Sequence, residues 1–280
     1  MSAKADVDLK DFGGLFRLDG KVAVVTGGSR GLGLHAASGL LQAGCSTVFI
    51  TSRKAKACTE AVDALNALPN IKGRAISVPA DLAKPGEVER LVKEVEKHTE
   101  HVDVLLANAG ATWGAPFDEH PESAFQKVMD LNVKSVFVCT QKFAPMLRKR
   151  ATLDDPSRIV ITASIAGIGI GSLGANATFG YSASKAAALH LGRNLAAELG
   201  PQHILTTSIC PGFFPTKMAN GLMELTGGVE ELAKANPNGR LGVPEDIAGT
   251  IVYLCSRAGS HVNGGHIVLD GGALTGRSRL

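Results

Sequence analysis

The fold is indicated most clearly by KVAVVTGGSRGLGLHAASGLLQA, residues 21–43. Its opening KVAVVTG is a short β-branched run that ends in glycine, which is typical of a buried parallel strand. The residues from Gly31 to Ala43 follow with a helical pattern. A glycine-rich turn therefore joins a strand to a helix at the beginning of the patterned region.

The alternation of strand and helix continues along the rest of the chain. Further strands are predicted in apolar, β-branched segments: 46–52, 74–80, 102–110, 158–164, 203–210 and 266–270. Helical patterns occupy segments between the strands: 31–43, 55–68, 88–95, 123–150, 181–199 and 244–256. With right-handed crossovers, this order predicts an α/β fold: a single-domain, doubly wound Rossmann fold with a parallel sheet and helices on both faces. We expect residues 1–18 to be an N-terminal extension and residues 19–280 to be the Rossmann-fold domain.

Composition excludes several classes of protein. The chain has 280 residues, of which 45% are hydrophobic, and this is enough for the core of one large α/β domain. The formal charge is +3 with acids and bases interleaved, so there is no basic stripe to indicate nucleic-acid binding. No apolar run reaches the roughly 18 residues that a membrane span needs, and the first residues lack the apolar core of a signal peptide.

A metal site is not expected. The five cysteines are scattered without a close pair, and the histidines form no HExxH pattern. We interpret the cysteines as buried, reduced thiols.

The glycine loop TGGSRGLG, residues 26–33, indicates a dinucleotide ligand. Gly27 allows a tight turn, and Gly31 and Gly33 remove side chains where the backbone must approach a pyrophosphate. The following helix presents free N–H groups and the positive end of its dipole to that anion.

The end of the second predicted strand favours NADP over NAD. An acidic residue at this position would hydrogen-bond the ribose hydroxyls of NAD. The sequence has instead Thr51, Ser52, Arg53 and Lys54. The guanidinium groups of Arg53 and Arg30 can face a 2′-phosphate. The alternative is that both are ordinary surface arginines.

Tyr181 and Lys185 form the candidate proton-delivery pair. They stand four residues apart in a segment of helical composition, so their side chains lie on one face. A neighbouring ammonium favours the ionised phenol and predicts a lowered pKa for Tyr181. The alternative is an amphipathic surface face, but the only other tyrosine, Tyr253, has no lysine four residues on. The glycine-rich segment 167–180, just before Tyr181, is expected to be a flexible loop that lines a substrate pocket.

The ordered motifs of residues 19–272 resemble those of the short-chain dehydrogenase/reductase family. TGGSRGLG resembles the family's TGxxxGxG loop, and the segment from Asn108 to Gly110 resembles the end of its NNAG motif, although Ala107 replaces the first asparagine. The resemblance implies NADP(H) as the cofactor. It also implies a set of cofactor-binding residues: Gly27, Ser29, Arg30, Gly31, Leu32, Gly33, Ser52, Arg53, Asp81, Leu82, Asn108, Gly110, Tyr181, Lys185, Pro211, Gly212 and Thr216.

The resemblance further implies a catalytic set: Asn132, Ser164, Tyr181 and Lys185. Tyr181 would protonate the substrate carbonyl oxygen, and Ser164 would hydrogen-bond the same oxygen. Lys185 would bond the nicotinamide ribose, and Asn132 would hold a water that passes protons toward Lys185. The interval between Ser164 and Tyr181 is longer than usual in the family, which leaves Ser172 and Ser182 as alternatives to Ser164.

Within the family, residues 108–137 are most similar to NADPH-dependent β-ketoacyl reductases of the bacterial type linked to rhamnolipid synthesis. This similarity implies reduction of a ketone to a secondary alcohol, with a 3-oxoacyl thioester or a similar apolar ketone as substrate. A polyol or sugar dehydrogenase and a reductase of polycyclic ketones in secondary metabolism are alternatives. A non-catalytic NADPH-sensing regulator is an alternative of another class, but it would not need all four catalytic positions to be filled.

The chain ends in Ser278, Arg279 and Leu280, a conservative variant of the SKL tripeptide that the peroxisomal import receptor reads. This ending is compatible with a peroxisomal or a cytoplasmic location. The family resemblance implies a homotetramer or homodimer, in which the helices at 123–150 and 181–199 pair between subunits.

Overall fold

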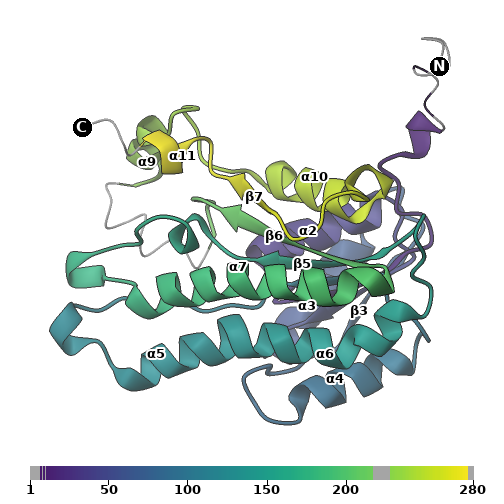
Figure 1. The fold of residues 1–280 in the computed structure, drawn as a ribbon, viewed down its shortest axis with the longest axis horizontal. Coiled ribbons are helices and arrows are strands. Elements are labelled where there is room, and N and C mark those ends of the chain that lie inside the picture. Colours follow the sequence, from purple (N-terminus) through teal and green to yellow (C-terminus); the bar gives the residue numbers. More distant parts are fainter. Residues whose placement is uncertain (1–6, 8, 10, 217–227, 277–280) are drawn as a thin grey trace.

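A parallel β-sheet forms the centre of the computed structural model, which describes residues 7, 9, 11–216 and 228–276. Its seven strands lie in the order β3-β2-β1-β4-β5-β6-β7, and every neighbouring pair is parallel (Figure 1). The strands have the following bounds: β1 Val22–Thr26, β2 Thr47–Thr51, β3 Arg74–Ser77, β4 Val104–Ala107, β5 Ser157–Thr162, β6 Ile204–Pro211 and β7 His266–Leu269. The predicted Rossmann-type fold with a parallel sheet is confirmed.

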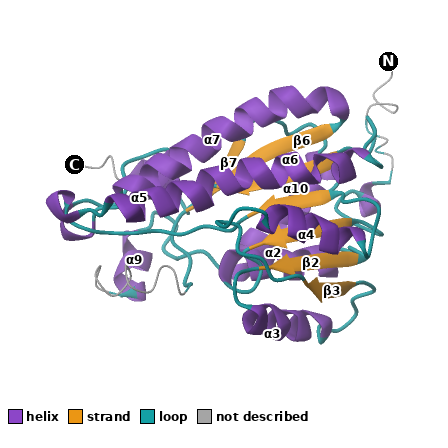
Figure 2. Cartoon of the chain, turned by 90° about the horizontal axis from the view of Figure 1, so that it is seen from below, coloured by secondary structure: helices purple, strands orange, loops and turns teal. Residues whose placement is uncertain are grey.

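Helices cover both faces of the sheet (Figure 2). One face packs against α2 (Gly31–Gln42), α3 (Ala55–Asn66) and α10 (Pro244–Cys255). The other face packs against α4 (Glu87–Glu96), α6 (Ser135–Arg148) and α7 (Phe179–Leu199). In the described part of the chain, the remaining α-helices are α5 (Glu122–Met129), α9 (Val229–Ala235) and α11 (Ala273–Gly276).

The central strands are continuous apolar runs because both of their faces are buried. In β1, Val24 faces the cluster that contains α4, α6 and α7, while Ala23 and Val25 face the cluster that contains α2, α3 and α10. Leu18, which precedes β1, is 1% exposed and belongs to the second cluster. The division between an extension at 1–18 and a domain at 19–280 stays a prediction.

The helix predicted over 123–150 is interrupted. It consists of α5, a π-helical turn at Asp130–Lys134 and α6. A π turn contains one more residue than an α turn, and such insertions are frequent at functional sites. Asn132, one of the candidate catalytic residues, lies in this turn.

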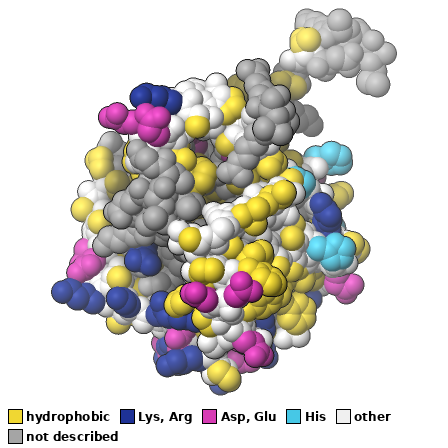
Figure 3. Space-filling view, turned by 90° about the vertical axis from the view of Figure 1, so that its left-hand side faces the viewer, with side chains coloured by type: hydrophobic (Ala, Val, Ile, Leu, Met, Phe, Trp, Pro, Cys, Tyr) yellow, Lys and Arg dark blue, Asp and Glu magenta, His cyan; other side chains and the backbone are white. Residues whose placement is uncertain are grey.

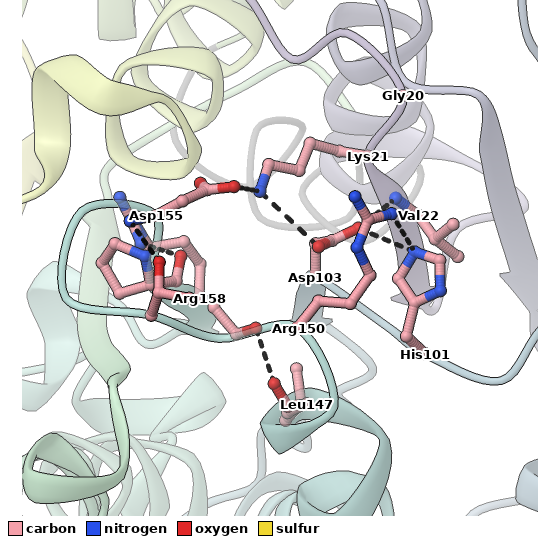
Figure 4. Close-up of polar contacts among 12 residues, drawn as sticks. Gly20, Lys21, Val22, His101, Asp103, Leu147, Arg150, Asp155 and Arg158 are labelled. Atoms are coloured by element: carbon pink, nitrogen blue, oxygen red, sulfur yellow. Dashed lines mark hydrogen bonds and ion pairs between the residues drawn. The ribbon is translucent and has the colours of Figure 1, made fainter.

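Polar side chains close the amino ends of the strands (Figure 4). Asp103, which is 4% exposed, accepts a hydrogen bond from the Val22 amide at 2.8 Å. Lys21 Nζ lies 3.5 Å from Asp103 and 2.5 Å from Asp155. The buried guanidinium of Arg158 donates to the carbonyls of Leu254 and Ser256 at 3.1 Å, and burial lowers its pKa. These contacts tie the beginnings of β1, β4 and β5 to the end of α10 and leave the carboxyl ends of the strands for a site.

The described residues contain neither a candidate membrane span nor a candidate metal site. Among them, no helix is long and apolar enough to cross a membrane. Within the same ranges, no group of three or more His, Cys, Asp and Glu side chains could hold a metal ion. All five cysteines are buried free thiols.

Candidate active site

Lys185 and Tyr181 lie on α7, where the predicted spacing brings them to one face. Lys185 Nζ lies 5.6 Å from the centroid of the Tyr181 ring. Lys185 is only 5% exposed, and its ammonium donates to the Thr162 carbonyl, at the end of β5, at 2.6 Å. Burial lowers the pKa of Lys185 to about 8.

Ser164 follows β5 directly and is the serine that contacts Tyr181. It is 7% exposed, its hydroxyl accepts from the Ala166 amide at 3.1 Å, and its side chain hydrogen-bonds that of Tyr181. The alternative Ser182 lies against Gly171 instead, because a Cβ built on that glycine would be 2.1 Å from Ser182 Oγ. The geometry therefore favours Ser164.

The pKa of Tyr181 differs from the sequence-based expectation. Burial raises it above the ordinary value, the hydrogen bond with Ser164 opposes that rise, and the nearby Cys210 thiol adds to it. The predicted lowering by Lys185 is wrong for this structure. The ammonium bonds the Thr162 carbonyl and is itself destabilised by burial, so desolvation of the phenol dominates. Tyr181 is therefore a protonated phenol at neutral pH.

Asn132 connects three segments around this pair. Its side chain is 2% exposed, and Nδ2 donates to the Ala111 carbonyl and to Ser184 Oγ, both at 2.9 Å. Its Oδ1 accepts from the Ala111 amide at 2.8 Å. Both amide hydrogens are thus used by protein acceptors, and only Oδ1 retains capacity for a water.

Gly110 lets the backbone lie close to both groups. A Cβ at this position would lie 3.2 Å from Asn132 Oδ1 and 3.6 Å from Lys185 Nζ. The two polar atoms therefore lie beside the same position, the one that a side chain at residue 110 would occupy.

The glycine loop joins the end of β1 to α2 with a left-handed backbone at two positions. Gly27 has φ +64° and Gly31 has φ +54°, which residues with a Cβ rarely adopt. A Cβ on Gly31 would also lie 3.3 Å from Thr216 Cγ2, so the loop that follows β6 meets the glycine loop here. The structure gives a reason for glycine at position 33 that differs from the predicted approach to a pyrophosphate. A Cβ on Gly33 would lie 2.5 Å from Asn108 Nδ2 and from the Gly27 carbonyl, so Gly33 allows close packing within the protein.

Thr26, which is not among the predicted cofactor-binding residues, holds the glycine loop in place. Its hydroxyl accepts from the amides of Asn108 and Ala109 at 2.9 and 3.0 Å. The Asn108 side chain donates in return to the Thr26 carbonyl at 3.0 Å. A polar residue at the end of an otherwise apolar strand was the signal for this role.

The other predicted cofactor residues also lie near the carboxyl ends of strands or at the start of α2. Arg30 is the exposed N-cap residue of α2, and Arg53 is exposed after β2. Ser29 lies in the glycine loop, and Leu32 lies in the first turn of α2. Ser52 follows β2, and its Oγ lies 3.2 Å from Cys58 Sγ. Pro211 is the last residue of β6, and Gly212 follows it. After β3, the amide of Asp81 donates to the Glu87 carboxylate at 3.2 Å, and Leu82 is 8% exposed.

These residues fit NADP(H). The glycine loop offers backbone without side chains, and exposed arginines without an acidic neighbour follow β1 and β2. The individual cofactor contacts and catalytic roles stay predictions.

Exposed apolar side chains occur in residues 113–117 and in the loop that precedes Tyr181. Phe117 is 76% exposed, Leu173 is 63% exposed and Trp113 is 46% exposed. The rings of Phe117 and Phe179 meet edge to face, with 5.7 Å between centroids, and the Ala115 amide bonds the Ala177 carbonyl at 3.1 Å. Hydrophobic side chains gather on the face at the carboxyl ends of the strands (Figure 3).

Known proteins with similar sequences and structures are oxidoreductases. Residues 27–274 match the family model described as enoyl-(acyl carrier protein) reductase. The rhamnolipids biosynthesis 3-oxoacyl-[acyl-carrier-protein] reductase of Pseudomonas aeruginosa is 40% identical over 92% of this chain and 97% of that protein. The 2-dehydro-3-deoxy-D-gluconate 5-dehydrogenase of Escherichia coli is 34% identical over 92% of this chain and 97% of its own length.

The solved structures include the Pseudomonas aeruginosa RhlG/NADP active-site complex. It is 38% identical in sequence, superposes with a TM-score of 0.86, and is matched over 93% of this chain and 98% of that chain. Similar sequences thus occur in proteins named for a 3-oxoacyl-[acyl-carrier-protein] and for a deoxygluconate.

Proposed function

This chain belongs to the short-chain dehydrogenase/reductase family and is an NADP-dependent oxidoreductase, and from this premise we propose that it reduces an apolar ketone to a secondary alcohol. A 3-oxoacyl thioester is the substrate class we favour. The observation that carries the proposal is a buried site in which a protonated Tyr181 is hydrogen-bonded to Ser164, with Lys185 Nζ 5.6 Å from its ring.

The glycine loop, with Gly27 and Gly31, and the arginines Arg30 and Arg53 would hold the cofactor. Bound NADPH supplies the hydride that reduces the carbonyl carbon. As negative charge grows on the carbonyl oxygen, Tyr181 gives it the phenolic proton. Ser164 donates a second hydrogen bond to that oxygen, and loss of one such donor typically costs about 2.7–4 kcal/mol of barrier height.

Lys185 and Asn132 support proton transfer. With a pKa of about 8, Lys185 is mostly an ammonium at neutral pH, and its charge favours the tyrosinate that remains after the proton has left. Lys185 Nζ and Asn132 both lie within 4 Å of the Cβ position of Gly110, and this proximity supports a role for Asn132 in the return of a proton from solvent through a bound water.

The apolar surroundings favour an acyl chain over a sugar. Phe117, Leu173 and Trp113 expose apolar surface in segments that adjoin α7 near Tyr181, where a polyhydroxylated substrate would need hydrogen-bond partners. The relative of 40% identity is named for a 3-oxoacyl substrate, which supports the same choice. A polyol or sugar dehydrogenase and a reductase of polycyclic ketones are the competing functions. A non-catalytic NADPH-sensing regulator is disfavoured because all four catalytic positions are filled.

A substrate panel tests this proposal. Oxidation of NADPH is followed by its absorbance with 3-oxoacyl thioesters of increasing chain length, with a polycyclic ketone and with a keto sugar acid. We expect kcat/KM to rise with chain length, by about tenfold for each two buried methylenes. Turnover of the sugar acid alone would overturn the choice of substrate.

A matched pair of variants locates the chain-binding surface. Leu173→Ser should lower kcat/KM for long-chain thioesters and leave that for the shortest ketone unchanged. Leu153→Ser removes a leucine of similar exposure, 78% against 63%, from the connection between α6 and β5, and should alter neither. Equal effects of the two substitutions would contradict an acyl-chain surface at Leu173.

Assembly and location are further parts of the proposal. We propose a homotetramer or homodimer, which light scattering of the purified chain tests through its mass. Ser278, Arg279 and Leu280 lie outside the described residues. Their proposed import function is tested by imaging a chain tagged at its N-terminus with and without these residues. A cytoplasmic signal from the intact chain would refute peroxisomal import.

A further inference from the structure

We propose that Ser184 is a positioning residue of the reductase site, which acts by holding the side chain of Asn132. The inference rests on the proposed function, since it assigns a part in that reaction. Ser184 lies between Tyr181 and Lys185 on α7, and it is fully buried at 0% exposure.

The Ser184 hydroxyl has two defined hydrogen bonds. It donates to the Tyr181 carbonyl, three residues earlier, at 2.7 Å. It accepts from Asn132 Nδ2 at 2.9 Å. Because its only hydrogen is used by the carbonyl, Ser184 Oγ can act only as an acceptor toward Asn132.

The orientation of the Asn132 amide follows from this polarity. Ser184 Oγ and the Ala111 carbonyl take both hydrogens of Nδ2, and the Ala111 amide donates to Oδ1. If the Asn132 amide were reversed, its NH2 group would face the Ala111 N–H, and both groups are hydrogen-bond donors. The network therefore holds Asn132 and the π turn beside Gly110, where a Cβ would also lie 3.6 Å from Lys185 Nζ.

Ser184 thereby couples the catalytic helix to the π turn. Without its hydroxyl, one hydrogen of a 2% exposed Asn132 amide has lost its acceptor, and the amide can gain another only by rotating. Rotation breaks the bonds of the amide to Ala111, loosens the π turn that holds Asn132 beside Lys185, and so slows the proton supply that the proposed function assigns to Asn132. Because Ser184 is 0% exposed, its side chain offers no surface to substrate or NADPH, so the loss concerns turnover and not binding.

Ser184→Ala is the direct test. We expect kcat to fall about tenfold, the scale of one lost hydrogen bond, while KM for NADPH and for the ketone stays within about twofold. The matched control is Ser256→Ala. Ser256 is 2% exposed and donates to the carbonyl three residues earlier, Tyr253, at 3.1 Å, at the far end of the sheet. This control should keep the kcat of the unsubstituted protein.

A double-mutant cycle with Asn132→Ala separates positioning from simple packing. If Ser184 acts through Asn132, Ser184→Ala lowers kcat no further in the Asn132→Ala background. An equal tenfold loss in both backgrounds, or a Ser184→Ala variant with unchanged kcat, would overturn the proposal. If Ser184→Ala does not fold, the same cycle is run with Ser184→Cys, whose thiol is a weak acceptor of similar size.

Tyr181→Phe, measured alongside, distinguishes the two proposals. An active Tyr181→Phe refutes the proposed function itself. An inactive Tyr181→Phe combined with a fully active Ser184→Ala refutes only the role of Ser184.

Discussion

Burial shifts the pKa values of Tyr181 and Lys185 in opposite directions. Both shifts suit a reductase that works at neutral pH. The pKa of Tyr181 is raised, so the phenol keeps the proton that it has to donate. The pKa of Lys185 is lowered to about 8, so the amine is still mostly charged at pH 7 but loses its proton in mildly alkaline solution. The acid and its supporting charge are therefore both present below about pH 8.

The pH dependence of turnover follows from these two directions. The ammonium form of Lys185 exists below its pKa of about 8 and disappears above it, while Tyr181 remains protonated. We expect kcat for ketone reduction to be flat at neutral pH and to fall as pH rises through about 8. Cys210→Ala should keep this limb, because burial raises the pKa of that thiol to about 11. A kcat that increases through pH 8 would contradict the assignment.

Arg53 should set the choice between the two nicotinamide cofactors. Arg53→Asp replaces a partner of the 2′-phosphate with a repelling carboxylate, so the ratio of kcat/KM for NADPH to that for NADH should fall at least about tenfold. Lys97→Asp makes the same charge change on an exposed side chain at the end of α4 and serves as control. Unchanged selectivity of Arg53→Asp in steady-state kinetics would exclude this role.

The site was only partly predictable from single residues. Helical spacing correctly predicts that Tyr181 and Lys185 share a face, because that geometry is local. The raised pKa of Tyr181 was not predictable, since it depends on how remote segments bury the phenol. The roles of Thr26 and Ser184 depend on partners 82 and 52 residues away, Asn108 and Asn132, and nothing in the local pattern identifies those partners.

At the scale of elements, the π turn between α5 and α6 is the main departure from the predicted helices. Apolar periodicity is similar on both sides of the turn, so the sequence predicts one helix. The turn buries Asn132, whose side chain bonds to Ala111 and Ser184. The interruption of the helix therefore coincides with contacts to other segments, which local helix propensity does not reveal.

The packing of α2 against α10 predicts opposite effects for two Gly→Ala substitutions. A Cβ on Gly39 of α2 would lie 2.8 Å from Ala248 Cβ, whereas a Cβ on Gly249 of α10 would meet nothing within 4 Å. Gly39→Ala should lower the free energy of unfolding by about 1–3 kcal/mol through overpacking. Gly249→Ala should raise it by about 0.4–1 kcal/mol through lower chain entropy in the unfolded state. Urea denaturation measures both, and a Gly39→Ala variant as stable as the parent would argue against this helix contact.

At the scale of the whole molecule, the two ends of the sheet have different tasks. The carboxyl ends carry the glycine loop, Ser164 and the segments that meet at Thr216 and Gly31. The amino ends are closed by Asp103, Lys21 and the buried Arg158 (Figure 4). The contacts that stabilise the amino ends thus lie at the opposite end of the strands from the proposed site, and substitutions at one end should leave the other unchanged.

Asp103→Ala tests this separation. The substitution leaves the Val22 amide without its buried acceptor, which should lower the free energy of unfolding by about 1–3 kcal/mol. The kcat of the folded variant should stay near that of the parent. Asp154→Ala, at an exposed aspartate in the loop before β5, is the control and should change neither quantity. A large loss of kcat at unchanged stability would contradict a purely structural role for Asp103.

The order of strands and helices was the most predictable part of the molecule. Apolar β-branched runs such as VAVVT in β1 and VLLA in β4 form strands because both faces of the sheet are covered. The meeting of the segments around Ala115 and Ala177 was not predictable, since it depends on long-range contacts, among them the backbone bond between these residues and the ring contact of Phe117 with Phe179.

The most direct test of the central claim compares the unsubstituted protein with Tyr181→Phe in a single experiment, the oxidation of saturating NADPH by a 3-oxoacyl thioester. Removal of the phenolic proton donor should lower kcat by about 100-fold or more, while the dissociation constant for NADPH, measured on the same samples, changes by less than about twofold. A Tyr181→Phe protein that retains most of its turnover would contradict the account, because the carbonyl oxygen would then receive its proton from another group.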